Sequence, residues 1–178
     1  MCSSDLSHEF GNDPGKIERY RAFWRRDAAK RPLAGFTLIG WFPLGDLAAA
    51  RRWPAGSDLH PEQVAPSELL DDHERMVREG EIMEDDLIRG AAPSQVAIPF
   101  LPAMLGATLR VLPESVLGLE RSLSWDDAMA IGLDPANPWY RRYFDLAAAL
   151  VERAAGRFPV RDRKSVVEGK SVELGGRR

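Results

Sequence analysis

The chain has 178 residues, of which 44% are hydrophobic and 29% are charged, and its formal net charge is −3. This composition is typical of one globular domain with an ordinary hydrophobic core, and it excludes the fibrous and disordered classes. Charges of both signs are interspersed along the chain, so no polybasic surface indicates binding to nucleic acid or to anionic lipid.

The N-terminal segment and the single cysteine indicate where the protein is expected to work. Cys2 has no second cysteine for a disulfide and no Cys or His neighbour for zinc, which favours a reducing, cytoplasmic setting. No apolar run approaches the about 20 residues of a membrane span. Residues 1–12 are polar and lack the apolar stretch of a signal peptide, so they are expected to form a disordered tail.

The first predicted elements are a helix and a strand. Asp13 followed by Pro14 is typical of a helix start, because aspartate caps free N–H groups and proline is favoured at the first helical position. The apolar side chains that then share one helical face are Ile17, Tyr20, Phe23 and Trp24. From Leu33 to Trp41 the chain is continuously apolar and bounded by prolines, which predicts a fully buried strand.

Two longer helices are predicted further along the chain. Ser67 is expected to cap a helix that runs to about Met83 and carries His73 on its apolar face. A packed, hydrogen-bonded histidine is favoured there over a catalytic one. A second, strongly amphipathic helix is predicted to begin at Pro138 and to end at Gly156.

Shorter elements lie between and after these helices. Residues 44–53 predict a short helix, residues 54–66 a loop with three prolines, and residues 108–112 a strand. Ser124 is expected to cap another short helix, and residues 157–160 to begin a further strand. This alternation predicts an α/β fold in which each helix returns the chain to a parallel strand.

The last 17 residues, 162–178, have a different character. Gly169-Lys170-Ser171 matches the end of a phosphate-binding loop, but Lys164 stands where that loop needs its first glycine, so a nucleotide site is excluded. DRKSVVEGKSVELGGRR instead resembles, nearly residue for residue, one translated reading frame of a sequencing adapter. Residues 162–178 are therefore expected to be a non-native tail, with a natural basic tail as the alternative.

Residues 13–161 resemble a known superfamily. The segments YRAFWRRDAAKRPLAGFTLIGWFPLGD, MEDDLIRGAAP, IPFLPAMLGATLRV and GRFPV are similar, in this order, to the N-terminal half of the uroporphyrinogen decarboxylase-like superfamily. That superfamily includes corrinoid- and cobalamin-linked methyltransferases. The resemblance implies an α/β fold that is the N-terminal half of a (β/α)8 TIM barrel, because a complete barrel needs roughly 250 residues.

Departures from the superfamily pattern narrow the implied chemistry. The decarboxylases hold substrate carboxylates with arginines after their first strand, but residues 41–46 (WFPLGD) contain none, and no aspartate near residues 96–99 matches the one under the pyrrole nitrogens. Pro102 and Ala107 stand where relatives usually have glutamate and cysteine. Porphyrinogen decarboxylation is therefore disfavoured.

The resemblance implies an enzyme as the complete parent, either a methyltransferase or a decarboxylase-like lyase for a small or tetrapyrrole-related ligand. Its implied partners are a small-molecule substrate and a corrinoid protein. The resemblance implies zinc or corrinoid as a cofactor of the full-length parent. It implies no cofactor site within residues 13–161, because the zinc-binding His and Cys of the methyltransferases lie in the C-terminal half. The alternative is a non-catalytic α/β domain that binds a partner through its helix faces.

Three candidate ligand-binding residues follow the first predicted strand. Trp41 and Phe42 would stack on a flat ligand and Asp46 would accept its N–H groups, because barrel active sites lie at the C-terminal ends of the strands. A strand end followed by a helix cap is the simpler alternative for this segment.

Further candidates are acidic. Asp85 and Asp86 would act as an acid–base pair or bind a cation, and Glu114, after the 108–112 strand, would serve as a general base. The alternatives are a solvated helix cap for the aspartates and a turn for Glu114. His60 lies in the proline-rich loop with nothing to support a pocket. The remaining tryptophans considered, expected to be core or interface anchors, are Trp24, Trp53, Trp125 and Trp139.

Overall fold

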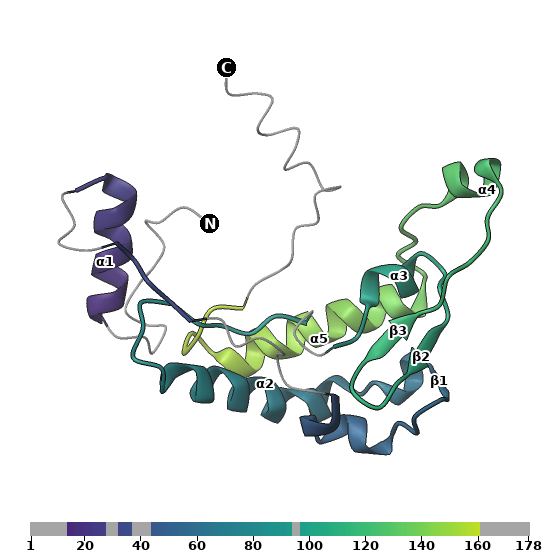
Figure 1. Ribbon diagram of the computed structural model, residues 1–178, viewed down its shortest axis with the longest axis horizontal. Coiled ribbons are helices and arrows are strands. Elements are labelled where there is room, and N and C mark those ends of the chain that lie inside the picture. The colour runs from purple at the N-terminus through teal and green to yellow at the C-terminus, as the bar shows by residue number, and fades with distance from the viewer. Residues whose placement is uncertain (1–13, 28–31, 37–43, 94–96, 161–178) are drawn as a thin grey trace.

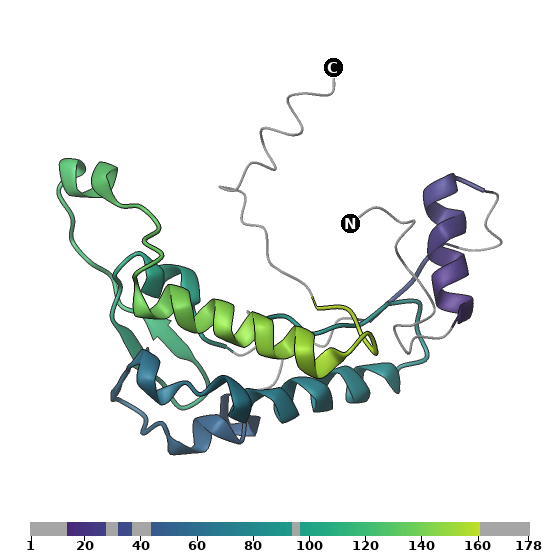
Figure 2. The ribbon, with the colours of Figure 1, turned by 180° about the vertical axis from the view of Figure 1, so that it is seen from behind.

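The computed structural model describes residues 14–27, 32–36, 44–93 and 97–160 (Figure 1). The predicted tails, the second half of the 33–41 strand, and Trp41 and Phe42 lie outside these ranges. Helices and a small antiparallel sheet form a mixed α/β structure. The chain follows an open arc, with α1 at one end, α4 at the other, and α2 and α5 along the base (Figures 1 and 2).

Helices α2 (Pro66–Glu81) and α5 (Pro138–Ala154) pack side by side, and both contribute buried side chains to the core. The predicted α5 is confirmed: the Asn137 side chain accepts a hydrogen bond from the Trp139 N–H at 2.8 Å, and Ala155 takes the left-handed conformation that ends the helix. The predicted cap at Ser67 is wrong. The helix begins at Pro66, which suits the first helical position, and its cap residue is Ala65, two residues before Ser67.

A three-stranded antiparallel sheet stands between the base and the α4 end. Its strands are β1 (Asp58–Leu59), β2 (Leu109–Val111) and β3 (Val116–Gly118), in that order. The predicted 108–112 strand is confirmed as β2, but its pairing is antiparallel because residues 112–115 form a hairpin loop. The predicted loop 54–66 supplies β1 and the short 3-10 helix η5 (Pro61–Gln63).

Three extended segments lie next to one another at the α1 side of the arc. The Asp86 N–H donates to the Ala34 carbonyl at 2.9 Å, and the Ala91 N–H donates to the Pro159 carbonyl at 3.0 Å. Ala91 and Val160 form a parallel bridge. The predicted strand at residues 33–41 is wrong over its described part, residues 33–36, which form no strand and leave Phe36 68% exposed.

The remaining helices are short or lie at the two ends of the arc. They are α1 (Pro14–Arg25), η3 (Leu44–Asp46), η4 (Ala49–Arg52), α3 (Phe100–Met104) and α4 (Trp125–Ala130). The predicted cap of α4 is confirmed, since the Ser124 hydroxyl accepts from the Asp127 N–H at 3.1 Å. No helix in the described ranges is long and apolar enough to span a membrane.

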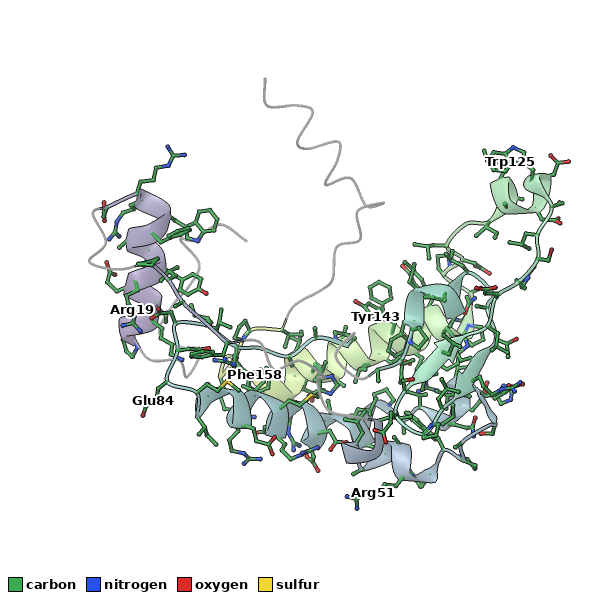
Figure 3. The ribbon with its side chains drawn as sticks, viewed as in Figure 1. Arg19, Arg51, Glu84, Trp125, Tyr143 and Phe158 are labelled. Carbon is green, nitrogen blue, oxygen red and sulfur yellow. The ribbon has the colours of Figure 1, made fainter. Side chains whose placement is uncertain are left out.

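The described tryptophans in the middle of the arc are buried, and those at its two ends are exposed. Trp53 and Trp139 are buried in the core, as expected of anchors. Trp24 on α1 and Trp125 on α4 are largely exposed, and Trp125 reaches 78% exposure at the outer tip of its end (Figure 3). Of the predicted apolar face of α1, Ile17 is buried while Phe23 is half exposed. The two ends therefore present apolar side chains that the middle of the arc does not cover.

Candidate functional site

The acidic pair Asp85–Asp86 follows α2 and is buried, so the alternative of a solvated helix cap is wrong. Arg89 binds the Asp85 carboxylate with both terminal nitrogens, each at 2.6 Å. The Phe36 N–H donates to the same carboxylate at 2.8 Å, and Lys16 Nζ lies 3.8 Å from it. This double hydrogen bond from Arg89 is the main cause that holds the pKa of Asp85 well below its usual range.

Asp86 makes an equivalent set of contacts with the first extended segment and α1. Its two carboxylate oxygens accept from Arg19 Nε at 2.8 Å and from the Ala34 N–H at 2.9 Å. Both aspartates thus join α1 and residues 32–36 to the segment after α2. The sequence analysis missed the partners Lys16, Arg19 and Arg89. Only Arg89, four residues after Asp85, carries a local signal, since an ion pair at that spacing is common.

The other predicted site residues lie elsewhere. Asp46 ends η3, and Glu114 is exposed in the β2–β3 hairpin loop, as its turn alternative expected. The Leu44 N–H donates to the Glu114 carbonyl at 3.2 Å, so the structure brings these two segments together. Asp86 belongs to the separate cluster that holds α1. In the described part of the chain, no three His, Cys, Asp or Glu side chains gather into a metal site.

His73 is fully buried on α2 and hydrogen-bonded, as predicted. Its Nδ1 lies 2.7 Å from the Leu69 carbonyl oxygen and its Nε2 lies 3.1 Å from that of Ala92. Burial lowers the pKa of His73, while the two carbonyl contacts and the neighbouring Asp72 oppose this effect. His73 therefore ties α2 to Ala92, within the connection that leads from α2 to α3.

The lowered pKa of His73 gives an expected pH dependence of stability. Because the unfolded chain takes up this proton at a higher pH than the folded chain, the free energy of unfolding should fall as the pH drops through about 6.5. In His73→Gln this fall should be smaller than in the parent protein. Urea unfolding at several pH values between 7.5 and 5.5 measures this fall in the free energy of unfolding. Identical pH profiles for the parent protein and His73→Gln would contradict the assignment.

A hollow of about 330 Å³ lies between β1, the turn after α3, the start of β2 and the start of α5. Most of its wall is apolar, and its polar side chains are His60, Thr108 and Asn137. The sequence analysis gave no support to a pocket at His60. Thr108 and Asn137 were missed because neither belongs to a chemical motif, and only the fold brings them near His60.

Asn137 has a fixed place in this wall. Its side-chain oxygen caps α5, and its nitrogen donates to the Met104 carbonyl at 3.0 Å, which ties the start of α5 to the end of α3.

Comparison with protein-family models, curated proteins and solved structures finds no match to this chain.

Proposed function

We propose that residues 13–161 are the N-terminal part of a (β/α)8 barrel enzyme of the uroporphyrinogen decarboxylase-like superfamily. The proposed activity of the complete protein is methyl transfer with a corrinoid protein as partner. Decarboxylation of a small or tetrapyrrole-related ligand is the second reaction of the same barrel. Zinc and corrinoid are assigned to the full-length protein and to none of residues 13–161, because the zinc-binding His and Cys of the methyltransferases lie in the C-terminal half.

One observation carries this proposal: a helix followed by an extended segment occurs three times, and the three extended segments are neighbours. Residues 32–36 follow α1, residues 84–91 follow α2 after a left-handed residue at Glu84 and bends at residues 85–86, and residues 158–160 follow α5. The second and third segments are parallel where Ala91 meets Val160, and their helices pack on each other. Repetition of this unit builds a barrel. The small antiparallel sheet lies within the connections between these units.

Gly90 supports the close approach of the second and third segments. A Cβ atom at this position would lie 2.0 Å from the Pro159 carbonyl oxygen, which is backbone and cannot rotate away. Only glycine lets the two segments approach each other this closely.

Gly90→Ala is therefore expected to lower the free energy of unfolding by about 1–3 kcal/mol, the usual range for overpacking. Gly45→Ala is the matched control, because nothing lies within 4 Å of a Cβ atom there. Thermal unfolding followed by circular dichroism compares the two variants. A Gly90→Ala protein as stable as Gly45→Ala would show that residues 84–91 and 158–160 do not meet in solution.

The exposed apolar surface of the α4 end favours the barrel over the alternative, a non-catalytic domain that folds alone. Residues 124–136 are all exposed, and their large hydrophobic members are Trp125, Met129, Ile131 and Leu133. A helix of six residues such as α4 is marginal without tertiary packing. Further chain that packs on this end would provide that packing. An independent binding domain would instead be monomeric, would unfold cooperatively, and would bury such surface.

The first test is to sequence the source gene through the codon for Val160 and beyond. A frame that continues into a strand and further helix–strand units supports the proposal. A stop codon directly after DRKSVVEGKSVELGGRR would overturn it, and the binding domain would take its place.

The second test uses the recovered full-length protein. Methyl transfer from a methylated substrate to cob(I)alamin changes the visible absorbance of the corrinoid, and turnover is the expected result. Loss of carbon dioxide from a carboxylated ligand without methyl transfer would favour the lyase over the methyltransferase.

A further inference from the structure

The walls of the hollow come from two connections that would lie on one face of the proposed barrel. β1 belongs to the connection between residues 32–36 and α2, while α3 and β2 belong to the connection between residues 84–91 and α5. In a (β/α)8 barrel the connections from strand to helix form the C-terminal face, where active sites are built. The hollow therefore lies on the active face if the proposed function holds.

We propose that this hollow binds a small, neutral, heteroaromatic ligand; its assignment to the active face rests on the proposed function, whereas the binding itself does not. Its volume of about 330 Å³ is at the lower end of the roughly 300–1,000 Å³ of ligand sites. Side chains that give it apolar walls are Leu59, Pro61, Leu109, Pro138 and Trp139. The Trp139 indole offers a flat ligand an aromatic contact.

The charge of the lining selects a neutral ligand. No Lys, Arg, Asp or Glu lines the hollow. A tetrapyrrole carries several carboxylates, and each would lose hydration here without gaining a cationic partner, which is costly. The hollow is also small for four pyrrole rings. Of the two ligand classes of the proposed enzyme, this site therefore favours the small one.

Two polar side chains provide directional contacts at the β1–β2 wall. The register pairs Asp58 with Arg110 and Leu59 with Leu109, and the residues next to this last pair, His60 and Thr108, both line the hollow. The His60 backbone is held by its N–H, which donates to Gln63 Oε1 at 2.7 Å. The Thr108 hydroxyl both donates and accepts, and the His60 ring offers one donor and one acceptor when neutral. A heteroaromatic ring with an N–H and an unprotonated nitrogen complements this pair.

The test uses indazole as the probe, with the 178-residue chain at pH 7.5 and saturation-transfer NMR titrations. Saturable binding to the parent protein is expected, with at least a tenfold loss of affinity in Thr108→Val and in His60→Ala. Ala107→Trp, which fills the hollow from its wall, should abolish binding. Ser57→Ala is the control, because Ser57 does not line the hollow and its hydroxyl donates to the Pro54 carbonyl.

Circular dichroism first establishes that each variant is folded. Binding that persists unchanged in a folded Ala107→Trp protein, or no saturable binding to the parent protein, would overturn the proposal. Equal or tighter binding of indazole-5-carboxylate would overturn the preference for a neutral ligand. Sequencing of the gene is independent of these titrations, so failure of the pocket and failure of the barrel assignment are distinguishable.

Discussion

Replacing Asp85 by alanine is expected to lower the free energy of unfolding by about 3–5 kcal/mol, the range for removing one partner of a buried ion pair. The Asp85 side chain is 2% exposed, and Arg89 and Lys16 are also mostly buried beside it. The variant leaves both cations without their carboxylate, and the Phe36 N–H loses its acceptor. The midpoint of urea unfolding measures the change.

Asp71→Ala is the matched control for this variant. Asp71 pairs with Arg153 on the surface and its side chain is 81% exposed, so its removal should cost no more than about 1 kcal/mol. Equal shifts of the urea midpoint in the two variants would contradict the buried ion pair of Asp85 with Arg89.

The stabilisation that Asp85 provides through its ion pair with Arg89 is also expected to depend on pH. Because the folded pKa of Asp85 is depressed, its stabilising contribution is present above the usual aspartate range near 3.9 and is lost as the pH falls through the lower folded value. Asp85→Ala should therefore be destabilised by the same amount at pH 8 and at pH 5. A difference between parent and variant that shrinks over this interval would mean that Asp85 is not held ionised by Arg89.

Sequence reasoning succeeded where the relevant signal is local. The apolar period of α5, its proline at the first position and the cap at Ser124 all lie within a few residues of the structure that they predict. His73 was placed on the buried face of α2 for the same reason. Each of these elements needs no partner to be recognised.

The rest of the fold depends on partners that no local pattern reveals. An apolar run such as residues 33–36 predicts a strand, but whether it is covered depends on segments far along the chain, and Phe36 is left exposed. β2 was predicted as a strand, yet its antiparallel neighbour β1 lies 50 residues earlier by the pairing of Leu59 with Leu109.

The candidate site was predictable only in part. The sequence shows Asp85 and Asp86 as an adjacent acidic pair. Their cationic partners come from α1 and from Arg89, so in the folded protein the pair holds α1 against the segment after α2. The hollow is built from three separated segments. None of its polar residues carries a motif, so a sequence pattern could not have brought Thr108 and Asn137 together with His60.

Leu150→Ala is expected to lower the free energy of unfolding by about 2–5 kcal/mol, the range for large-to-small changes in a packed core. Leu150 is fully buried on α5, the helix that packs beside α2, and Leu146 lies one turn before it. Alanine is the best helix former, so the substitution leaves the helix itself intact and removes only packing. Urea unfolding measures this loss of packing, provided that the slope of the free energy of unfolding against urea concentration is the same in the variant and the parent protein.

Val151→Ala, at the next position of the same helix, is the control. Val151 is 60% exposed, so its truncation should change stability by no more than about 0.5 kcal/mol. Because the two substitutions share one helix and one product residue, the difference between them measures burial at the α2–α5 contact. Equal losses would mean that α5 does not pack on α2 through Leu150, and the helical base that joins the two ends of the arc would then have to be rejected.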